Sequence, residues 1–340
     1  MIIVNRKNKT KKVENTAMKP LLSVNNLSIH FLTGSGVIKA VDQISYELNA
    51  GETLGIVGES GCGKSVSALS LLRLIPSPPG KIVGGEILFE GKDLLKATKK
   101  ELSSIRGNRI AMIFQEPMTS LNPVQRIGCQ VREPLLLHKQ MKKHRATAEA
   151  INALQKVRIP DSESRIKDFP HQFSGGMRQR AMIAMGLTCA PKLIIADEPT
   201  TALDVTIQAQ LLSLMKQLTR ETGTALMVIT HNLGIIARYA DRVNVMYAGR
   251  IVEKAAARDL YKHPKHPYTI GLMASVPQLS QNVRERLMPI EGQPPDLADL
   301  PAGCAFAPRC RFAIEQCRRE SPVLRTVSEG HEIACWLDVE

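Results

Sequence analysis

The stretch Thr53-Leu54-Gly55-Ile56-Val57-Gly58-Glu59-Ser60-Gly61-Cys62-Gly63-Lys64-Ser65 decides the fold of this 340-residue chain. A short apolar run leads into a turn of the form GxxxxGK[ST], and residues 64–74 then show helical spacing until Pro76. In such a loop the glycines let backbone N–H groups converge on a phosphate. The lysine reaches the β and γ phosphates and the serine hydroxyl ligates Mg²⁺. The sequence therefore predicts a nucleoside triphosphate site made of Gly58, Glu59, Ser60, Gly61, Cys62, Gly63, Lys64 and Ser65.

Apolar patterning around this loop predicts an α/β fold. Residues 21–31 and 37–48 resemble two strands separated by a turn-rich segment, so an antiparallel hairpin is expected before the loop. Four further apolar runs fit buried strands of a parallel core sheet: 110–114, 193–196, 225–229 and 243–247. The region from about 120 to 190 is largely helical in pattern, and we expect a helical subdomain there.

Composition sets the domain plan and the kind of partner. The chain carries 45 Lys plus Arg against 32 Asp plus Glu, a formal charge of +13, which favours anionic partners. Residues 1–19 form a basic polar leader, 20–262 a nucleotide-binding domain, and 263–340 a proline-containing extension that ends in clustered cysteines. No apolar run approaches the ~20 residues that span a bilayer. We therefore expect a cytosolic or peripheral protein.

Two acidic residues end the apolar run that starts at Leu193. Asp197 is placed to hold Mg²⁺, directly or through water, as in other phosphate-loop enzymes. Glu198 is the next residue and can act as general base toward an attacking water. The pattern is that of a Walker-B strand, although a solvated acidic turn before Pro199 is the alternative.

The segment Phe173-Ser174-Gly175-Gly176-Met177 separates one class of phosphate-loop enzymes from the rest. It resembles the ABC signature LSGGQ, with Phe173 and Met177 departing at the first and last positions. Ser174 would cap a helix whose first N–H groups favour a phosphate. The resemblance implies that Ser174, Gly175, Gly176 and Met177 contact ATP held by an opposite subunit.

Further positions match the ABC family in the expected order. Gln115 resembles the Q-loop residue that senses Mg²⁺ and the γ-phosphate, and is a candidate Mg²⁺ ligand with Ser65 and Asp197. Asp204 resembles the D-loop residue of the dimer interface, and His231 resembles the switch histidine. Together with Glu198, Gln115 and His231 form the expected catalytic set. Phe31 in the first hairpin is the candidate aromatic for stacking on adenine.

The resemblance sharpens to one branch of the ABC family. Residues 114–123, 174–180 and 263–269 are similar to the D-type ATP-binding subunits of dipeptide and oligopeptide permeases. This implies ATP hydrolysis on the cytoplasmic face of the bacterial inner membrane. The implied partners are a homologous F-type ATPase subunit, two transmembrane permease subunits and, indirectly, an extracytoplasmic peptide-binding protein, with no nucleic acid.

Two other readings stay open. Nickel, glutathione or another substrate of the same importer branch could replace peptides. A DNA-repair ABC ATPase is the alternative from another class, but Ser65 and Ser174 are only 109 positions apart, which leaves no room for the long inserted arm of such proteins.

Four of the seven cysteines crowd the last 37 residues: Cys304, Cys310, Cys317 and Cys335. Intervals of five, six and seventeen residues separate them, and no CxxC occurs. From spacing alone an iron–sulfur cluster, a zinc site and unliganded thiols all remain open. The resemblance to peptide-importer subunits implies a 4Fe–4S cluster here. His331 is a fallback ligand or, as the alternative we favour, an exposed loop residue.

Overall fold

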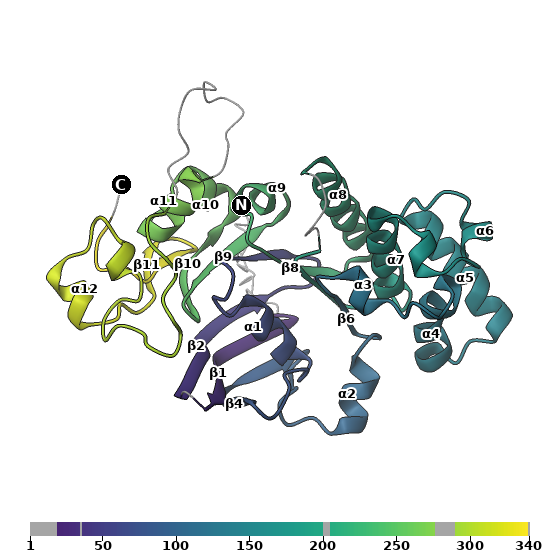
Figure 1. Ribbon diagram of the computed structural model, residues 1–340, viewed down its shortest axis with the longest axis horizontal. Coiled ribbons are helices and arrows are strands. Elements are labelled where there is room, and N and C mark those ends of the chain that lie inside the picture. Colours follow the sequence, from purple (N-terminus) through teal and green to yellow (C-terminus); the bar gives the residue numbers. More distant parts are fainter. Residues whose placement is uncertain (1–18, 35, 200–204, 276–289, 339–340) are drawn as a thin grey trace, which may run out of the picture.

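A computed structural model shows an α/β chain built on two sheets (Figure 1). The structure describes residues 19–34, 36–199, 205–275 and 290–338. Almost all of the basic leader and the predicted D-loop residue Asp204 lie outside these ranges.

The larger sheet has eight strands in the order β11-β12-β10-β9-β3-β8-β7-β6. Its parallel part contains β6 (Ile110–Ile113), β7 (Leu193–Asp197), β8 (Ala225–Thr230), β3 (Thr53–Val57) and β9 (Arg242–Tyr247). Antiparallel pairing then adds β10 (Arg250–Ala256), β12 (His331–Ile333) and β11 (Arg325–Ser328). In parallel sheets the carboxyl ends of strands share an edge, where ligands bind. Here that edge holds the ends of β3, β6, β7 and β8.

The smaller sheet is antiparallel, with the order β2-β1-β4-β5. Its strands are β1 (Leu22–Thr33), β2 (Gly36–Leu48), β4 (Gly80–Phe89) and β5 (Lys92–Asp93). The expected hairpin is therefore present as β1 and β2. The sequence did not predict β4, which pairs along the other side of β1.

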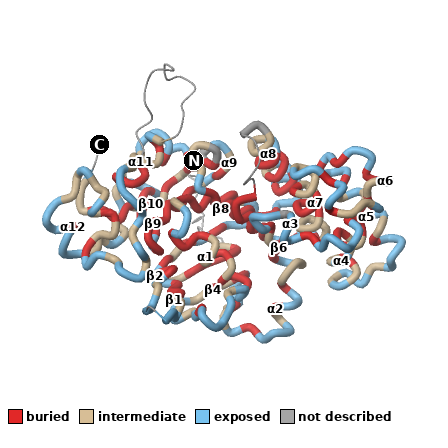
Figure 2. The backbone as a smooth tube through the Cα atoms, viewed as in Figure 1, coloured by how far each residue is buried: buried red, intermediate tan, exposed pale blue. Residues whose placement is uncertain are grey.

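Alternating side chains of the parallel strands face two different cores. Ile194, Leu226 and Val243 belong to a core with the helices of the 120–190 region. Leu193, Ala225 and Met227, the sequence neighbours of Ile194 and Leu226, belong to a second core with α1 and the smaller sheet. Figure 2 shows the buried backbone concentrated along β8, β9 and their neighbours. The parallel strands are thus covered on both faces, which explains their continuous apolar runs.

Helices fill the connections. Between β6 and β7 lie α3 (Pro117–Ser120), α4 (Ile127–Lys139), α5 (Lys143–Lys156), α6 (Ser162–Arg165) and α7 (Gly175–Leu187), which form the right side of Figure 1. The others are α1 (Lys64–Leu71), α2 (Lys99–Ile105), α8 (Val205–Thr222), α9 (Leu233–Tyr239), α10 (Ala257–Lys262), α11 (Pro267–Ala274) and α12 (Glu315–Arg319). Of the helices in the described ranges, none combines the length and apolar character that a bilayer crossing requires.

The part of the chain after residue 262 is joined to the larger sheet. Strands β11 and β12 extend that sheet through β10. Buried Glu253 of β10 accepts hydrogen bonds from the backbone N–H groups of Lys265 and His266 and lies 2.7 Å from His331 Nε2. His331 is only 4 % exposed, so our expectation of an exposed loop residue is wrong. It is held by Glu253 because a buried carboxylate needs hydrogen-bond donors.

Candidate functional site

The phosphate loop curls around the amine of Lys64. Lys64 Nζ donates to the carbonyl oxygens of Gly58 and Glu59, both at 2.8 Å, and the residue is buried. Gly63 has φ of +99°, and a Cβ on it would overlap the carbonyl oxygen of Ala40. This position therefore needs a glycine for both its backbone conformation and its space. The loop lies at the end of β3 and opens α1, as the sequence predicts.

Two of the residues expected to hold Mg²⁺ are in contact: Ser65, which follows the phosphate loop's lysine, and Asp197 at the end of β7. Ser65 Oγ donates to Asp197 Oδ1 at 2.9 Å. Burial raises the pKa of Asp197, and the nearby Glu198 charge adds to this, while the Ser65 hydrogen bond and Lys64 oppose it. A hydroxyl and a carboxylate are oxygen ligands of the kind that Mg²⁺ prefers, so these residues fit the ion.

Glu198 is the meeting point of the three expected catalytic residues. Gln115 Nε2 donates to Glu198 Oε2 at 3.2 Å, and His231 Nδ1 lies 3.4 Å from Glu198 Oε1. Glu198 adopts φ of +43°, and its N–H donates to the carbonyl oxygen of Ile229. A left-handed non-glycine residue is uncommon and clusters at functional sites. The three side chains come from the ends of β6, β7 and β8, so the parallel sheet brings them together.

The signature turn lies apart from this group. Ser174 caps α7 by accepting a hydrogen bond from the Met177 N–H, and Ser174 and Gly175 are exposed. Phe173 before them is buried in the first core, and Met177 packs partly against it. Figure 1 places α7 well away from α1, which follows the phosphate loop. A capped helix start suits an anion, but the phosphate loop of the same chain lies elsewhere.

Phe31 lies on β1, between Ile38 of β2 and Gly80 of β4. Its ring packs partly against the second core and lies close to Gly80. Stacking of Phe31 on adenine stays a prediction.

The four clustered cysteines converge. Cys304, Cys310, Cys317 and Cys335 line one small cavity together with His266, Phe306 and Trp336. All four are free thiols, and burial raises the pKa values of Cys304, Cys310 and Cys335. Within the described ranges, no group of three or more His, Cys, Asp or Glu residues has the arrangement of ligands around a metal ion.

Sequence reasoning missed two residues that contact the phosphate loop. Tyr268 and Arg309 both reach Glu59 from the C-terminal part of the chain. Neither lies in a local pattern that indicates a nucleotide site.

Comparison with known proteins agrees with this geometry. A model of the ABC transporter family matches residues 41–201, and a model of the oligopeptide/dipeptide transporter C-terminal region matches residues 252–317. Among solved structures, the dimeric ATP-binding cassette MJ0796 in a post-hydrolysis state bound to ADP and Pi aligns with a TM-score of 0.63 and 27% identity. The match covers 70% of this chain and 99% of that one. Fold and site together define an ATPase of the ABC class.

Two relatives narrow the family. Oligopeptide transport ATP-binding protein OppD of Haemophilus influenzae is 52% identical over 95% of this chain and 99% of its own length. Dipeptide transport ATP-binding protein DppD of Bacillus subtilis is 51% identical over 94% of this chain and 95% of its own length. The chain belongs to the family of ATP-binding subunits of oligopeptide and dipeptide ABC transporters.

Proposed function

We propose that this chain hydrolyses ATP in a head-to-tail pair with a homologous F-type cassette and so drives a dipeptide or oligopeptide importer. The observation that carries the proposal is the separation of two half-sites. The phosphate loop, Asp197 and Glu198 share one sheet edge, whereas the Ser174 turn is exposed on a distant helix. In a head-to-tail pair of cassettes, the phosphate loop of each lies opposite the signature turn of the other, so the two half-sites meet. ATP then lies between the phosphate loop of one and the signature turn of the other.

Glu198 is the proposed general base for the attacking water. Its carboxylate is held by Gln115 on one oxygen and faces His231 on the other, so its orientation is fixed. Lys64 is placed to stabilise charge on the phosphates. Ser65 and Asp197, with Gln115 as a further candidate, would hold Mg²⁺, and the ion would supply positive charge next to the phosphoryl oxygens.

The segment 115–132 is the proposed docking site for a membrane permease subunit. Three apolar side chains in or beside it are exposed: Phe114 at 40 %, Met118 at 57 % and Val124 at 80 %. Neighbouring exposed apolar groups favour a protein partner. Because Gln115 begins this segment and contacts Glu198, closing of the ATP site would move the docking surface. This arrangement supports a peripheral position on the cytoplasmic face of the inner membrane.

Reconstitution tests the substrate. The chain, its F-type partner and the co-purifying permease pair are placed in liposomes that contain Mg-ATP, with the cognate extracytoplasmic binding protein outside. We expect uptake of labelled di- or oligopeptide that stops when ATP is omitted. Uptake of nickel or glutathione without peptide would instead identify another substrate of the same branch. ATPase activity stimulated by DNA, without a co-purifying permease, would support a DNA-repair protein.

We infer that the cysteine cavity holds a 4Fe–4S cluster. Four thiols on one cavity supply the ligand set that such clusters use, and zinc accepts the same donors. Iron, acid-labile sulfide and zinc are measured on the anaerobically purified chain. Four iron and four sulfide per chain are expected, and zinc without sulfide would contradict the inference.

A further inference from the structure

Glu59, the second residue of the phosphate loop, is held from two sides by the C-terminal part of the chain. Its backbone N–H donates to Tyr268 Oη at 2.8 Å. Its carboxylate accepts two hydrogen bonds from Arg309, with Nη1 to Oε2 at 2.7 Å and Nη2 to Oε1 at 2.9 Å. These contacts span 209 and 250 positions of sequence. One loop residue is thus fixed through both its main chain and its side chain.

Arg309 is itself firmly held. Its side chain is 5 % exposed, against 25 % for Glu59. Its Nε donates to the carbonyl oxygen of Glu291 at 3.0 Å, and its guanidinium lies 5.9 Å from the centre of the Tyr247 ring. The hydrogen bonds to Glu59 raise the pKa of Arg309, so the side chain stays charged. The Arg309–Glu59 contact is a bidentate ion pair that is largely shielded from water. Such charge-assisted pairs are among the strong hydrogen-bonded contacts in proteins.

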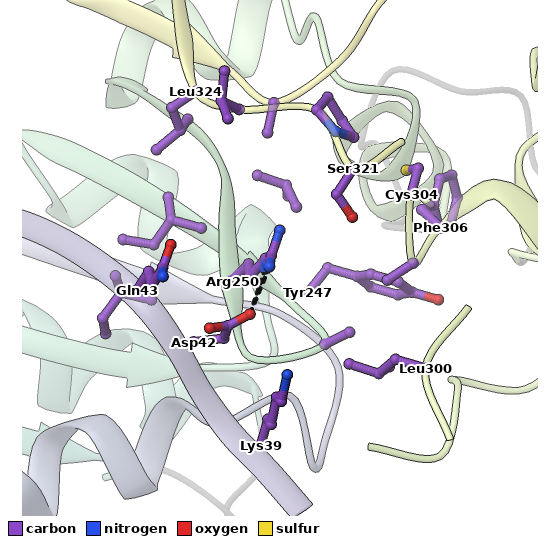
Figure 3. Close-up of a pocket in the computed structure, with 18 of the residues that line it drawn as sticks. Lys39, Asp42, Gln43, Tyr247, Arg250, Leu300, Cys304, Phe306, Ser321 and Leu324 are labelled. Carbon is purple, nitrogen blue, oxygen red and sulfur yellow. Dashed lines mark hydrogen bonds and ion pairs between the residues drawn. The ribbon is translucent and has the colours of Figure 1, made fainter. Parts of the chain in front are cut away.

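Three aromatic rings pack together between the C-terminal part that carries Arg309 and the larger sheet. The ring centroid of Tyr247, at the end of β9, lies 4.6 Å from that of Tyr268 and 5.2 Å from that of Phe306. The ring centroids of Tyr268 and Phe306 lie 5.4 Å apart. Figure 3 shows Tyr247 and Phe306 on the wall of a cavity of about 750 Å³ between the first hairpin and the C-terminal segment. Such packing sets the distance between Arg309 and the loop.

Charge gives this contact a consequence for nucleotide binding. The phosphate loop receives a strongly anionic triphosphate, and Glu59 places a carboxylate within that loop. An unpaired carboxylate there would repel the phosphates, and its partial burial would strengthen the repulsion. Arg309 neutralises this charge, and Tyr268 fixes the direction of the Glu59 peptide N–H.

We propose that Arg309 and Tyr268 form a C-terminal clamp on the phosphate loop and act as positioning residues that set the affinity of the cassette for Mg-ATP. They touch the loop, and they influence ATP through Glu59. The clamp makes nucleotide affinity depend on a segment that lies outside the residues matched to the ABC transporter family model.

Kinetics of the assembled transporter with full-length subunits test the clamp. Arg309→Met should raise KM for ATP about tenfold, the value of one charge-assisted contact, and change kcat less than about threefold. Tyr268→Phe should raise KM about threefold because it removes a neutral hydrogen-bond acceptor. Arg319→Met is the matched control: this arginine lies on the same C-terminal part but pairs with exposed Glu315, so KM should not change.

A rescue variant separates charge neutralisation from folding. In an Arg309→Met background, Glu59→Gln removes the unpaired carboxylate, and KM should return to within about threefold of the parent value. Arg309→Lys keeps the charge without the paired geometry and should give an intermediate KM. If Arg309→Met alone does not fold, Arg309→Lys and the double variant carry the test. An unchanged KM in Arg309→Met, or a KM in the double variant about tenfold or more above the parent value, would overturn the clamp.

Discussion

The phosphate loop and the signature turn both bind phosphate in the proposed function, yet the chain supports them in opposite ways. Distant segments hold the phosphate loop: Asp197 contacts Ser65, and both Tyr268 and Arg309 contact Glu59. At the signature turn, Ser174 caps its own helix, Phe173 and Met177 pack against the first core, and Ser174 and Gly175 are exposed.

The comparison indicates which half-site a single chain forms by itself. A loop fixed from several sides is preorganised, so ATP binding to it needs little rearrangement. An exposed turn on a rigid helix is presented to another molecule. Variants in the first half should therefore change ATP binding to the single chain, whereas variants in the second should change ATP hydrolysis only in the assembly.

The largest expected effect separates binding from chemistry in the phosphate-loop half. Glu198→Gln should lower ATP turnover about 100-fold or more, because an amide cannot accept the proton of the attacking water. ATP binding to the single chain should persist, since Lys64 and the loop are unaltered. Turnover and equilibrium binding are measured side by side, with exposed Glu221→Gln as control. Undiminished turnover would remove Glu198 from the role of base.

Gly63→Ala tests the support of the phosphate loop. The added Cβ would overlap the carbonyl oxygen of Ala40 at a positive φ, which should lower the free energy of unfolding by about 1–3 kcal/mol and weaken ATP binding about tenfold or more. Gly91→Ala is a matched control because Gly91 has φ of +78° with nothing within 4 Å of its Cβ. It should carry the backbone strain without loss of ATP affinity. Equal ATP affinities for the two variants would contradict the account.

Gly176→Ala tests the signature half. The nearest heavy atom to a Cβ there is Ile207 Cγ2 at 3.9 Å, an ordinary contact. The single chain should keep its stability and its ATP affinity. In the assembled transporter, hydrolysis should fall about tenfold because glycine allows close approach of the partner's nucleotide. A loss of ATP affinity in the single chain would contradict the assignment of Gly176 to the half-site that serves the partner's nucleotide.

The smallest expected effect concerns the signature cap. Ser174→Ala removes the acceptor for the Met177 N–H and should lower the free energy of unfolding by about 1 kcal/mol. Ser174→Gly should cost only a few tenths of that. Denaturant unfolding of the full chain measures both. Equal stability of parent and Ser174→Ala would show that the cap contributes nothing.

Local patterns predicted much of the fold and brought out the site residues. Strand β3 has the predicted bounds, Thr53–Val57, because a buried parallel strand is apolar throughout and a glycine turn ends it. The predicted helix from Lys64 ends at Leu71, three residues early. Gln115, Glu198 and His231 were found as separate motifs, and the parallel order of β6, β7 and β8 explains why they meet.

Long-range and irregular features could not be predicted from the sequence. Strand β4 contains Gly84 and Gly85, which suggest a turn. At Gly85 the strand passes so close to Leu27 of β1 that a side chain would not fit. Arg309 lies 250 residues from Glu59, and only the return of the C-terminal segment onto the larger sheet brings them together. His331 is polar and follows a glycine turn, so no local pattern indicates its burial beside Glu253.

In the proposed function, the signature turn of a second cassette completes the binding site of the ATP held by the Lys64 loop. A structure of the assembled transporter carrying Glu198→Gln, determined with Mg-ATP, tests it most directly. Ser174 should lie within hydrogen-bond distance, about 3 Å, of a phosphate oxygen of ATP held by the partner cassette. ATP enclosed by a single chain, with Ser174 remote from every bound nucleotide, would contradict the account.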